Sequence, residues 1–518
     1  MFRSFAVARP PTPPAYAQSI WRARGLSSAP SWYAEWVKLS LEILKSAWKV
    51  LASHVRANRE IWLIVLVGFL AYSHLSLIRH WHFQSNGYDL GIFDQAIWKY
   101  SRFLSPEVTV HGKHILGEHF HPILILLVPL YWVLPRAEVL LVVQAFALCI
   151  AALPVYLFAQ KRLGKWPALL LALSYLAFWG IQLTALYDFH EVSLAVPLVA
   201  WAVWAVDLKK WRQYWISLVL LLLCKENMSL LAVGFGAYLL IQKEYRRAWV
   251  SILAGVGWFV VTIKLLIPHF AGGAYEFWKY SELGSGPGSA FASLLLHPVS
   301  SLKVLVNQPE KRETLWLLFS PFLFLFIASP LVILVVPLIL ERFLSDTQNL
   351  WTASYHYNAV VAPVLVMATA DGIWRLAGYI PRPTLRKLVT VLVSCVTVGI
   401  GCWVTVVREF PLLAYARVKK LQLVTIRDED RVGMRAVGAI PEGATVSSQD
   451  PIIPHLSARR EIYEVKLEKP TEYYIRGPHL TAWPLVGDWE IDAIFSRRES
   501  EGYTRVFDEA GWLVLKRP

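Results

Sequence analysis

The sequence has little charge: of its 518 residues only 17% are charged, whereas 56% are hydrophobic. A soluble protein of this length needs more charged residues to cover its surface, so a soluble globular fold is excluded. The hydrophobic residues come in blocks separated by short polar breaks, and a block of about 20 apolar residues can span a bilayer. Tryptophan is frequent at the edges of these blocks, where amphipathic rings settle at a membrane interface. We therefore predict a polytopic α-helical protein of the cell (plasma) membrane.

Cysteine is also scarce. The four cysteines lie inside apolar blocks without metal-ligand spacing, which favours packing or lipid-facing roles, at Cys149, Cys224, Cys395 and Cys402. No cleavable signal peptide is evident, because residues 1–30 have no apolar core and are predicted to be disordered. Residues 33–57 combine apolar residues at helical spacing with interleaved lysines. This predicts an amphipathic helix on the inner membrane surface or a short cytoplasmic helix packed on the protein, so that residues 1–60 form a cytoplasmic extension.

Acidic residues are outnumbered, with 37 Asp and Glu against 51 Lys and Arg. Most of the basic residues between blocks fall in alternate loops, which is typical of the positive-inside pattern and not of a nucleic-acid-binding protein. This pattern predicts about eleven spans within residues 61–410, with the N-terminus inside and the C-terminus outside. The predicted spans are 61–78, 137–159, 167–185, 191–206, 212–224, 228–242, 248–268, 314–328, 330–344, 355–374 and 388–407.

Two further regions follow from the same pattern. The apolar run 121–134 is shorter than the roughly 20 residues of a span, so we predict a re-entrant or juxtamembrane helix within an outer loop, 79–136. In residues 411–518 charge becomes frequent and the apolar runs shorten, which predicts a small extracytoplasmic α/β domain. Its predicted strands are 444–447, 461–465 and 472–475, with a terminal hairpin of 503–507 and 512–515.

Ionisable residues near membrane depth gather on the outer side. The outer side is assigned from Lys and Arg at the inner ends of the spans and not from these ionisable residues. Their convergence on one side is therefore a largely independent check of the topology. Such residues are costly in a membrane unless paired or hydrated, and they predict one polar cavity open to the outside. The alternative is that some are ordinary solvated loop residues. The candidate substrate-binding residues are Glu118, His119, His121, Asp188, His190, Glu191, Lys225, Glu226 and His356.

Two aspartates stand at the start of an expected helix in the first outer loop. Asp89 follows Asn86 and Gly87 and is expected to cap a helix that runs to about Phe103. Asp94 lies five residues further on, so the two side chains point in different directions. One could act as a general base while the other orients it. The cap accounts for Asp89 structurally, but it does not account for Asp94.

Histidines, a glutamate and a lysine are candidates for binding a metal ion, a phosphate or a lipid headgroup. Glu118, His119 and His121 could bind a divalent metal ion, although hydrogen bonds to a substrate phosphate and ordinary helix caps are alternatives. Lys225 could pair with the neighbouring glutamate or hold a phosphate as a point charge. His356 lies at a membrane edge and could contact a lipid headgroup.

Several motifs carry a resemblance to a known family. They are YDLGIFDQAIW, GEHFHPILILLVPLY, YDFHEVSLAVPL, KENMSLL, YHYNAVVAPVL and PIIPHLSARREIYEV. Over roughly residues 60–518 these motifs resemble those of a prokaryotic family of predicted membrane proteins, the domain-of-unknown-function 2079 family (DUF2079). That family in turn resembles the C-type glycosyltransferases of the GT-C fold.

The resemblance implies a function. In C-type glycosyltransferases the first outer loop has juxtamembrane helices and bears a catalytic acidic residue. The donor is a polyprenyl-phosphate-linked sugar, and transfer occurs outside the membrane. The resemblance implies Asp89 as the counterpart of that acid, with Asp94 as the rival. In the GT-C enzymes the acidic pair is often adjacent, whereas Leu90 follows Asp89 here, so the choice of base stays open.

The leading hypothesis is a GT-C-like glycosyltransferase. An inverting transfer needs a carboxylate to take the acceptor's proton and cations on the departing phosphate, roles open to either aspartate and to Lys225, His190 or His119. The expected partners are the bilayer, a polyprenyl-phosphate-linked sugar and an acceptor, with no nucleic acid. One alternative is a transporter or flippase, which needs polar groups through the membrane. The other is a non-catalytic protein of envelope assembly whose C-terminal domain binds a partner.

Overall fold

The computed structural model describes residues 52–273, 278–415, 424–467 and 469–518, with isolated positions between 38 and 49. The predicted disordered segment 1–30 and most of the predicted amphipathic helix 33–57 lie outside the described residues. The chain divides into two units, Met1–Leu63 and Ile64–Pro518. The described part of the first unit is helical, and its Trp62 indole donates to the His54 ring at 3.2 Å. Everything that follows concerns the second unit.

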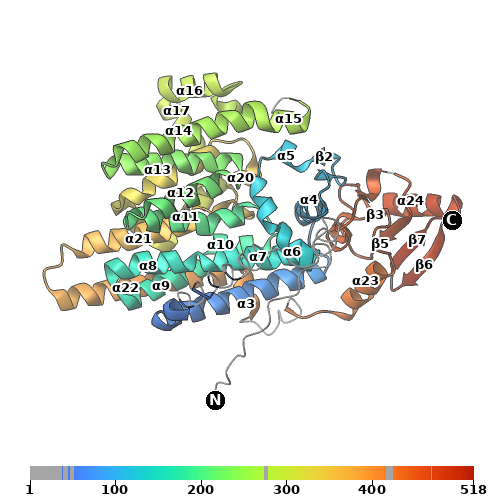
Figure 1. The fold of residues 1–518 in the computed structure, drawn as a ribbon, viewed down its shortest axis with the longest axis horizontal. Helices are drawn as coiled ribbons and strands as arrows, with labels where there is room; N and C mark the ends of the chain where they lie inside the picture. Colours follow the sequence, from blue (N-terminus) through green and yellow to red (C-terminus); the bar gives the residue numbers. More distant parts are fainter. Residues whose placement is uncertain are drawn as a thin grey trace, which may run out of the picture. The chain divides into compact units, whose positions relative to one another are not determined.

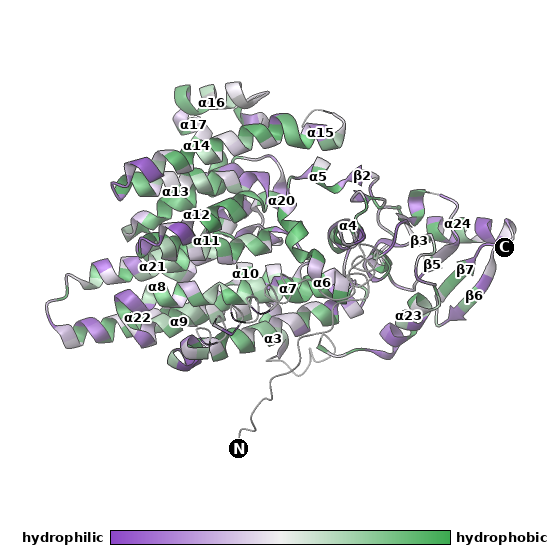
Figure 2. Cartoon of the chain, viewed as in Figure 1, coloured by the Kyte–Doolittle hydropathy of each residue, from purple (hydrophilic) through white to green (hydrophobic). Residues whose placement is uncertain are grey.

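Apolar helices make up most of the second unit (Figures 1 and 2). Among the described residues, five are long and apolar enough to cross a membrane, or up to seven if each bent pair is one span. The five are Arg59–Trp81 (α3), Ala137–Leu163 (α7 and α8), Tyr245–Ala271 (α14 to α15), His356–Ala377 (η10 to α21) and Pro383–Val407 (α22). Each coincides with a predicted span. The total of eleven stays a prediction.

Shorter helices occupy the other predicted spans. The predicted span 167–185 is a pair bent by 46°, Lys165–Leu176 (α9) and Trp179–Leu186 (α10). The spans predicted between 191 and 242 are Val192–Asp207 (α11), Trp211–Leu222 (α12) and Ser229–Ile241 (α13). The remaining helices of this region are Pro287–Leu296 (α16), Pro298–Lys303 (α17), Pro309–Phe319 (α18), Val336–Phe343 (α19) and Gln348–Trp351 (α20).

The predicted spans 314–328 and 330–344, which are short for a bilayer, are broken helices. After α18 the chain forms the 3₁₀ turns Ser320–Phe322 (η7), Leu325–Ala328 (η8) and Pro330–Leu334 (η9) before α19 begins. Pro321 is the second residue of η7 and Pro330 the first residue of η9, and a proline has no N–H to continue an α-helix. The broken segment packs against α21, where a Cβ on Gly372 would lie 2.0 Å from the Leu325 carbonyl oxygen.

The segment predicted to be the first outer loop, 79–136, contains short helices and one β-hairpin. It contains a π-helical turn, Gly87–Gly91 (η1), followed without a break by Ile92–Ser101 (α4). Then come the antiparallel strands Glu107–Val108 (β1) and Lys113–His114 (β2), Ile115–Glu118 (α5), Pro122–Leu127 (η2) and Val128–Val133 (α6). The predicted run 121–134 is thus a pair of short helical pieces. The predicted cap at Asp89 is wrong, because the helix begins two residues earlier, after Asn86.

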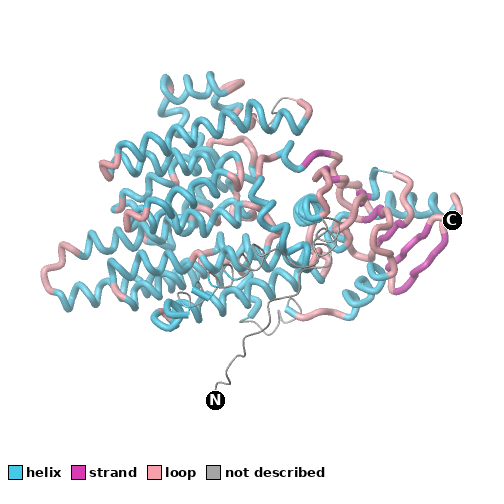
Figure 3. Tube along the Cα trace, in the orientation of Figure 1, coloured by secondary structure: helices cyan, strands magenta, loops and turns pink. Residues whose placement is uncertain are grey.

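The C-terminal region is a mixed α/β unit. Its described residues form a five-stranded sheet in the order β4-β3-β5-β7-β6, seen as magenta strands in Figure 3. The strands are Val446–Ser448 (β3), Ile462–Glu464 (β4), Tyr473–Arg476 (β5), Thr504–Glu509 (β6) and Trp512–Lys516 (β7). β3 is parallel to β4 and β5, whereas β7 is antiparallel to β5 and β6. The helices are Asp428–Gly438 (α23), Asp450–His455 (η13) and Asp488–Ser500 (α24). The predicted strands and hairpin are confirmed within two residues.

One hydrophobic core joins the first outer loop to the C-terminal sheet. Leu90, Phe93 and Ile97 of the loop helix are buried together with Ile453 and Val514. The 3.6-residue period of the helix puts these three on one face, and burial of apolar area stabilises the contact. The loop helix that carries both candidate aspartates is therefore fixed by residues more than 300 positions away.

Candidate functional site

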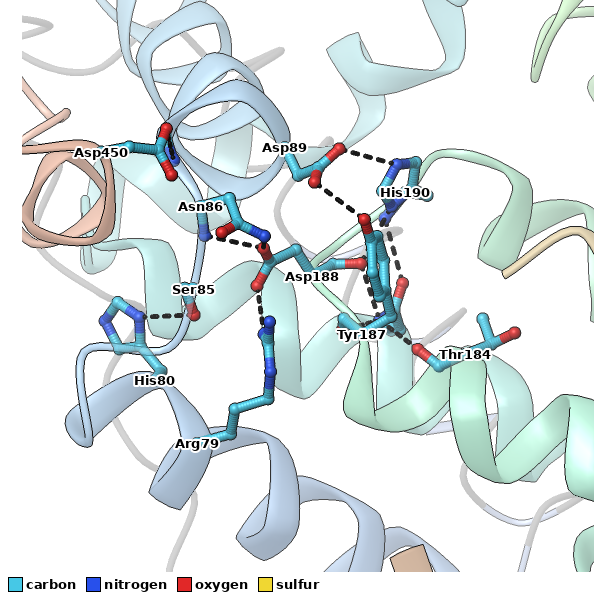
Figure 4. A network of polar contacts seen from close by, with 12 residues as sticks. Arg79, His80, Ser85, Asn86, Asp89, Thr184, Tyr187, Asp188, His190 and Asp450 are labelled. Atoms are coloured by element: carbon cyan, nitrogen blue, oxygen red, sulfur yellow. Dashed lines mark hydrogen bonds and ion pairs between the residues drawn. The ribbon is translucent and has the colours of Figure 1, made fainter. Parts of the chain in front are cut away.

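Asp89 stands at the centre of a small polar network (Figure 4). The Tyr187 hydroxyl donates to Asp89 Oδ2 at 3.1 Å, and His190 Nε2 lies 3.4 Å from Asp89 Oδ1. The Asp89 side chain is still 26% exposed, so a molecule can reach it. Burial raises its pKa, but the hydrogen bond and charge of His190, with the Tyr187 hydroxyl, outweigh burial and lower the pKa below its ordinary value. Asp89 is therefore a reachable carboxylate that stays ionised at neutral pH.

The His190 ring is held in an orientation that lets it pair with Asp89. Its Nδ1 lies 3.0 Å from the Asp188 carbonyl oxygen, which can only accept, so Nδ1 carries a proton. Its ring stacks on the ring of His356 with the centroids 3.6 Å apart. Burial lowers the pKa of His190, but Asp89 outweighs it and the net pKa is raised. An imidazolium that donates from both nitrogens fits both contacts.

Asp188 anchors the turn beneath this network. It is fully buried, binds the Arg79 guanidinium at 2.6 Å and accepts from the Asn86 backbone N–H at 2.8 Å. Burial is the largest influence on its pKa and raises it, although Arg79 opposes the shift. Gln144 fixes the same turn, because its side-chain amide donates to the Thr184 carbonyl and accepts from the His190 N–H. Asp188 thus lies next to the acidic site without facing it.

Three ion pairs connect the outer loops. Asp89 pairs with His190, Glu191 with Lys225 at 3.0 Å, and Glu226 with His119 at 2.7 Å. Since 190 and 191 are neighbours in the chain, as are 225 and 226, the pairs follow one another as a continuous chain of charges. We call these six residues the ion-pair chain. It brings three outer loops together, and Lys225 and Glu226 pair with other residues, not with each other.

Two buried side chains near the ion-pair chain have polar atoms without partners among the described residues. Arg342 is 4% exposed and donates to the Asn358 side chain at 2.7 Å, while its Nη1 has no partner in the described part of the chain. His121 is also buried, and neither of its ring nitrogens has a partner among the described residues. Burial lowers the pKa of His121 to about 4, so its ring is neutral and can donate or accept one hydrogen bond. These unsatisfied groups are suited to a polar ligand.

Several of these residues were not predicted from the sequence. Arg79 and Tyr187 lie at the ends of apolar helices and Gln144 lies inside α7, and none of them belongs to a recognisable pattern. Arg342 had a signal, because Glu341 and Arg342 interrupt an apolar run much as Lys225 and Glu226 do.

Asp94 has different surroundings from Asp89. It is 1% exposed and accepts hydrogen bonds from the Tyr131 hydroxyl and the Ser457 hydroxyl, both at 2.6 Å. Burial raises its pKa to about 7, although both hydroxyls act in the opposite direction. Its carboxyl group is enclosed by protein and ties the loop helix to Ser457 of the C-terminal α/β region. This geometry favours Asp89 over Asp94 as the group that meets a substrate.

The raised pKa of Asp94 predicts how stability changes with pH. In the unfolded chain an aspartate titrates near 3.8, whereas Asp94 in the fold titrates near 7. Between these values the unfolded state binds fewer protons, so this contribution to stability is present below pH 4 and is lost as pH rises to 7. We expect Asp94→Asn to flatten the fall in melting temperature between pH 5 and pH 8. The exposed Asp428→Asn serves as control and should keep the wild-type slope. An unchanged slope in D94N would contradict this assignment.

The residues suggested as a metal site have separate partners. Glu118 lies 3.6 Å from His111, whereas His119 binds Glu226. Within residues 52–273, 278–415, 424–467 and 469–518, no group of three or more His, Cys, Asp or Glu side chains is placed to hold a metal ion. The structure therefore does not bring Glu118, His119 and His121 together as a ligand set.

A cavity of about 810 Å³ lies against the Arg79 side chain. Its wall includes Arg79, which binds Asp188, and residues 183 and 186 of α10, which lead to Tyr187. Its lining combines leucines with charged and amide side chains, among them Gln84, Glu310, Glu313, Gln348 and Arg408. A polar ligand with an apolar portion suits such a lining.

The fold has counterparts among solved structures. ArnT from Cupriavidus metallidurans bound to undecaprenyl phosphate is similar with a TM-score of 0.50 and 14% identity, over 88% of this chain and 97% of that chain. The apo state of the same protein gives a TM-score of 0.48 and 14% identity, over 89% and 98%. The first likeness shows a shared fold. The family model described as predicted membrane protein (DUF2079) matches residues 79–479, and the chain belongs to this family. No curated protein matches the chain.

Proposed function

We propose that this chain is a membrane glycosyltransferase that transfers a sugar from a polyprenyl-phosphate-linked donor to an acceptor on the extracytoplasmic side. The observation that carries the proposal is the geometry of Asp89, a reachable carboxylate held ionised by His190 and Tyr187 in the first outer loop. The GT-C-like fold supports it, and the similar ArnT structure contains undecaprenyl phosphate. In this proposal the protein lies in the plasma membrane with its N-terminus cytoplasmic and its C-terminal domain outside.

The reaction is a single displacement. Asp89 takes the proton of an acceptor hydroxyl while the acceptor oxygen forms a bond to the anomeric carbon of the donor sugar. The bond between that carbon and the phosphate oxygen breaks, and the electron pair leaves on the phosphate. Cations placed where this charge develops stabilise the transition state. Lys225 and Arg342 are the groups we assign to this role, with His119, His121 and His356 as donors to the phosphate or the sugar.

Most of the remaining polar residues of the site orient the groups that meet the substrate. Asp188 and Gln144 fix the turn that presents Tyr187 and His190, and such positioning is itself a large part of catalysis. Glu191 keeps Lys225 charged and oriented, and Glu226 orients the His119 ring. Glu118 lies at the outer edge beside His111 and is assigned to sugar hydroxyls.

Donor cleavage tests the proposal directly. The purified chain in lipid vesicles is incubated with polyprenyl-phosphate-linked sugars and with envelope lipid and glycan fractions as acceptors. We expect free polyprenyl phosphate to accumulate together with a glycosylated acceptor, both detected by mass spectrometry. A donor that crosses the bilayer with its sugar still attached would contradict the proposal and favour a flippase. Donors that remain intact and in place would contradict it as well.

A further inference from the structure

The start of the helix that carries Asp89 is held from outside its own loop. A helix leaves its first N–H groups without partners within the helix. Here Asp450 Oδ1 accepts from the Gly87 N–H at 2.9 Å and from the Tyr88 N–H at 3.3 Å. The preceding N–H, of Asn86, binds Asp188 at 2.8 Å. Two distant carboxylates thus fix three consecutive amides directly before Asp89 (Figure 4).

The contact with Asp450 is also a close packing contact. A Cβ on Gly87 would lie 2.7 Å from Ile453 Cδ1, and a Cβ on Gly91 would lie 2.9 Å from Ile453 Cγ2. Both distances are shorter than real Cβ contacts, so any larger residue at either position must displace the Ile453 side chain or the backbone beside it. Ile453 is fully buried and belongs to η13, the same turn that begins at Asp450. Glycine at both positions therefore permits η1 to lie directly on η13.

Further hydrogen bonds continue this contact along the helix. The Gln95 side chain donates to the Arg459 carbonyl at 3.2 Å, and the Ser457 hydroxyl donates to Asp94. These bonds fix α4 to the C-terminal domain beyond Asp89. Asp450 holds the turn in which Asp89 itself lies. A carboxyl oxygen suits two N–H donors at a helix start, which carries partial positive charge. Burial and the nearby Glu464 raise the pKa of Asp450 to about 7, and its Oδ1 can accept these hydrogen bonds in either protonation state.

We infer that Asp450 is a positioning residue for Asp89: through the Gly87 and Tyr88 amides, the turn Asp450–His455 of the C-terminal domain sets the direction of the Asp89 carboxylate and completes the acidic site. This inference rests on the proposed function, in which Asp89 is the general base. It gives the C-terminal domain a role in the reaction in place of an independent binding module. A displacement of about 1 Å at a catalytic group can lower the rate about 100-fold.

The first test compares two substitutions at one position. Asp450→Ala removes the acceptor, and we expect kcat to fall about 10- to 100-fold while KM for the donor stays within about twofold. Asp450→Asn keeps an oxygen that can accept both N–H groups, and we expect it to recover most of the lost kcat. Glu472→Ala is the matched control, because Glu472 accepts the Thr445 N–H within the same domain. Wild-type kcat in D450A, equal losses in D450A and D450N, or a rise in KM without loss of kcat would each overturn the inference.

A second test uses the packing contact and does not touch Asp450. We expect Gly91→Ala to lower kcat because its new methyl group pushes against Ile453. Ile453→Ala removes the Cγ2 atom that this methyl group meets, so the double variant G91A/I453A should recover kcat relative to G91A. A double variant no more active than G91A would contradict positioning through this contact.

A readout independent of catalysis separates the two proposals. Hydrogen–deuterium exchange of the peptide covering residues 86–91 should rise in D450A and return toward wild type in D450N. If Asp89→Asn keeps full activity while exchange follows this pattern, the proposed function fails and the structural hold on the helix stands. If Asp89→Asn is inactive while D450A has wild-type exchange and activity, the positioning role fails and the proposed function stands.

Discussion

Asp89→Asn is expected to lower kcat for sugar transfer about 10²- to 10⁴-fold, the range that general-base catalysis contributes. The amide is nearly the same size and can still accept from the Tyr187 hydroxyl, but it cannot take a proton. Since the side chain is 26% exposed, the fold loses little by the change. The rate is measured as release of polyprenyl phosphate at saturating donor.

Asp94→Asn is the matched control for this experiment. Both aspartates lie in the same loop helix, yet Asp94 is enclosed by Tyr131 and Ser457. We expect D94N to keep its kcat within about tenfold of wild type, because a buried positioning group acts only through packing and orientation. Loss of activity in D94N with full activity in D89N would exchange the roles of the two residues. Full activity in both variants would remove the proposed mechanism.

Lys225→Met is expected to have the second large effect, on both stability and activity. The substitution removes the lysine that lies 3.0 Å from Glu191, whose carboxylate is only 1% exposed. Removing one partner of a buried ion pair lowers the free energy of unfolding by about 3–5 kcal/mol. The substitution also removes the cation that we assign to the departing phosphate. The double variant Lys225→Met/Glu191→Gln removes both charges and should regain much of the stability, measured as melting temperature, while transfer stays strongly reduced.

A second pair in the same protein gives the control for Lys225. Lys161 lies 3.0 Å from Asp207, but the lysine is 52% exposed. An exposed pair contributes about 0–1 kcal/mol, so Lys161→Met should leave both melting temperature and transfer close to wild type. Recovery of full activity in K225M/E191Q would show that the lysine acts only on stability, and the phosphate role would then be abandoned.

Much of the fold could be predicted because it depends on local patterns. Apolar blocks of sufficient length gave the long helices, and alternation of apolar residues gave the strands of the C-terminal sheet. The breaks in segment 314–344 could not be predicted, because its composition is predominantly apolar. Prolines and packing against Gly372 decide where the helix breaks. The prediction that Asp89 caps the loop helix was wrong for a related reason. The first amides of this helix bind carboxylates that lie 102 and 363 positions further along the chain.

The residues of the ion-pair chain could be predicted as candidates, but their pairing could not, and Arg79, Gln144, Tyr187 and Arg342 were missed. The expectation that polar residues of several outer loops converge rests on topology, and the structure brings six of them together in the ion-pair chain. The pairing of Lys225 with Glu191 depends on how neighbouring helices rotate, which periodicity alone does not fix. The difference between Asp89 and Asp94 arises from burial against Ser457, which lies 363 positions from Asp94.

The central claim is that Asp89 faces the anomeric carbon of a lipid-linked sugar whose phosphate lies toward Lys225 and Arg342. A cryo-EM structure of D89N in lipid nanodiscs with a polyprenyl-phosphate-linked sugar tests it most directly. We expect the sugar to lie next to residue 89 and the phosphate within hydrogen-bond distance of the Lys225 or Arg342 side chain. A donor bound with its phosphate remote from both cations, or with its sugar away from residue 89, would contradict the account.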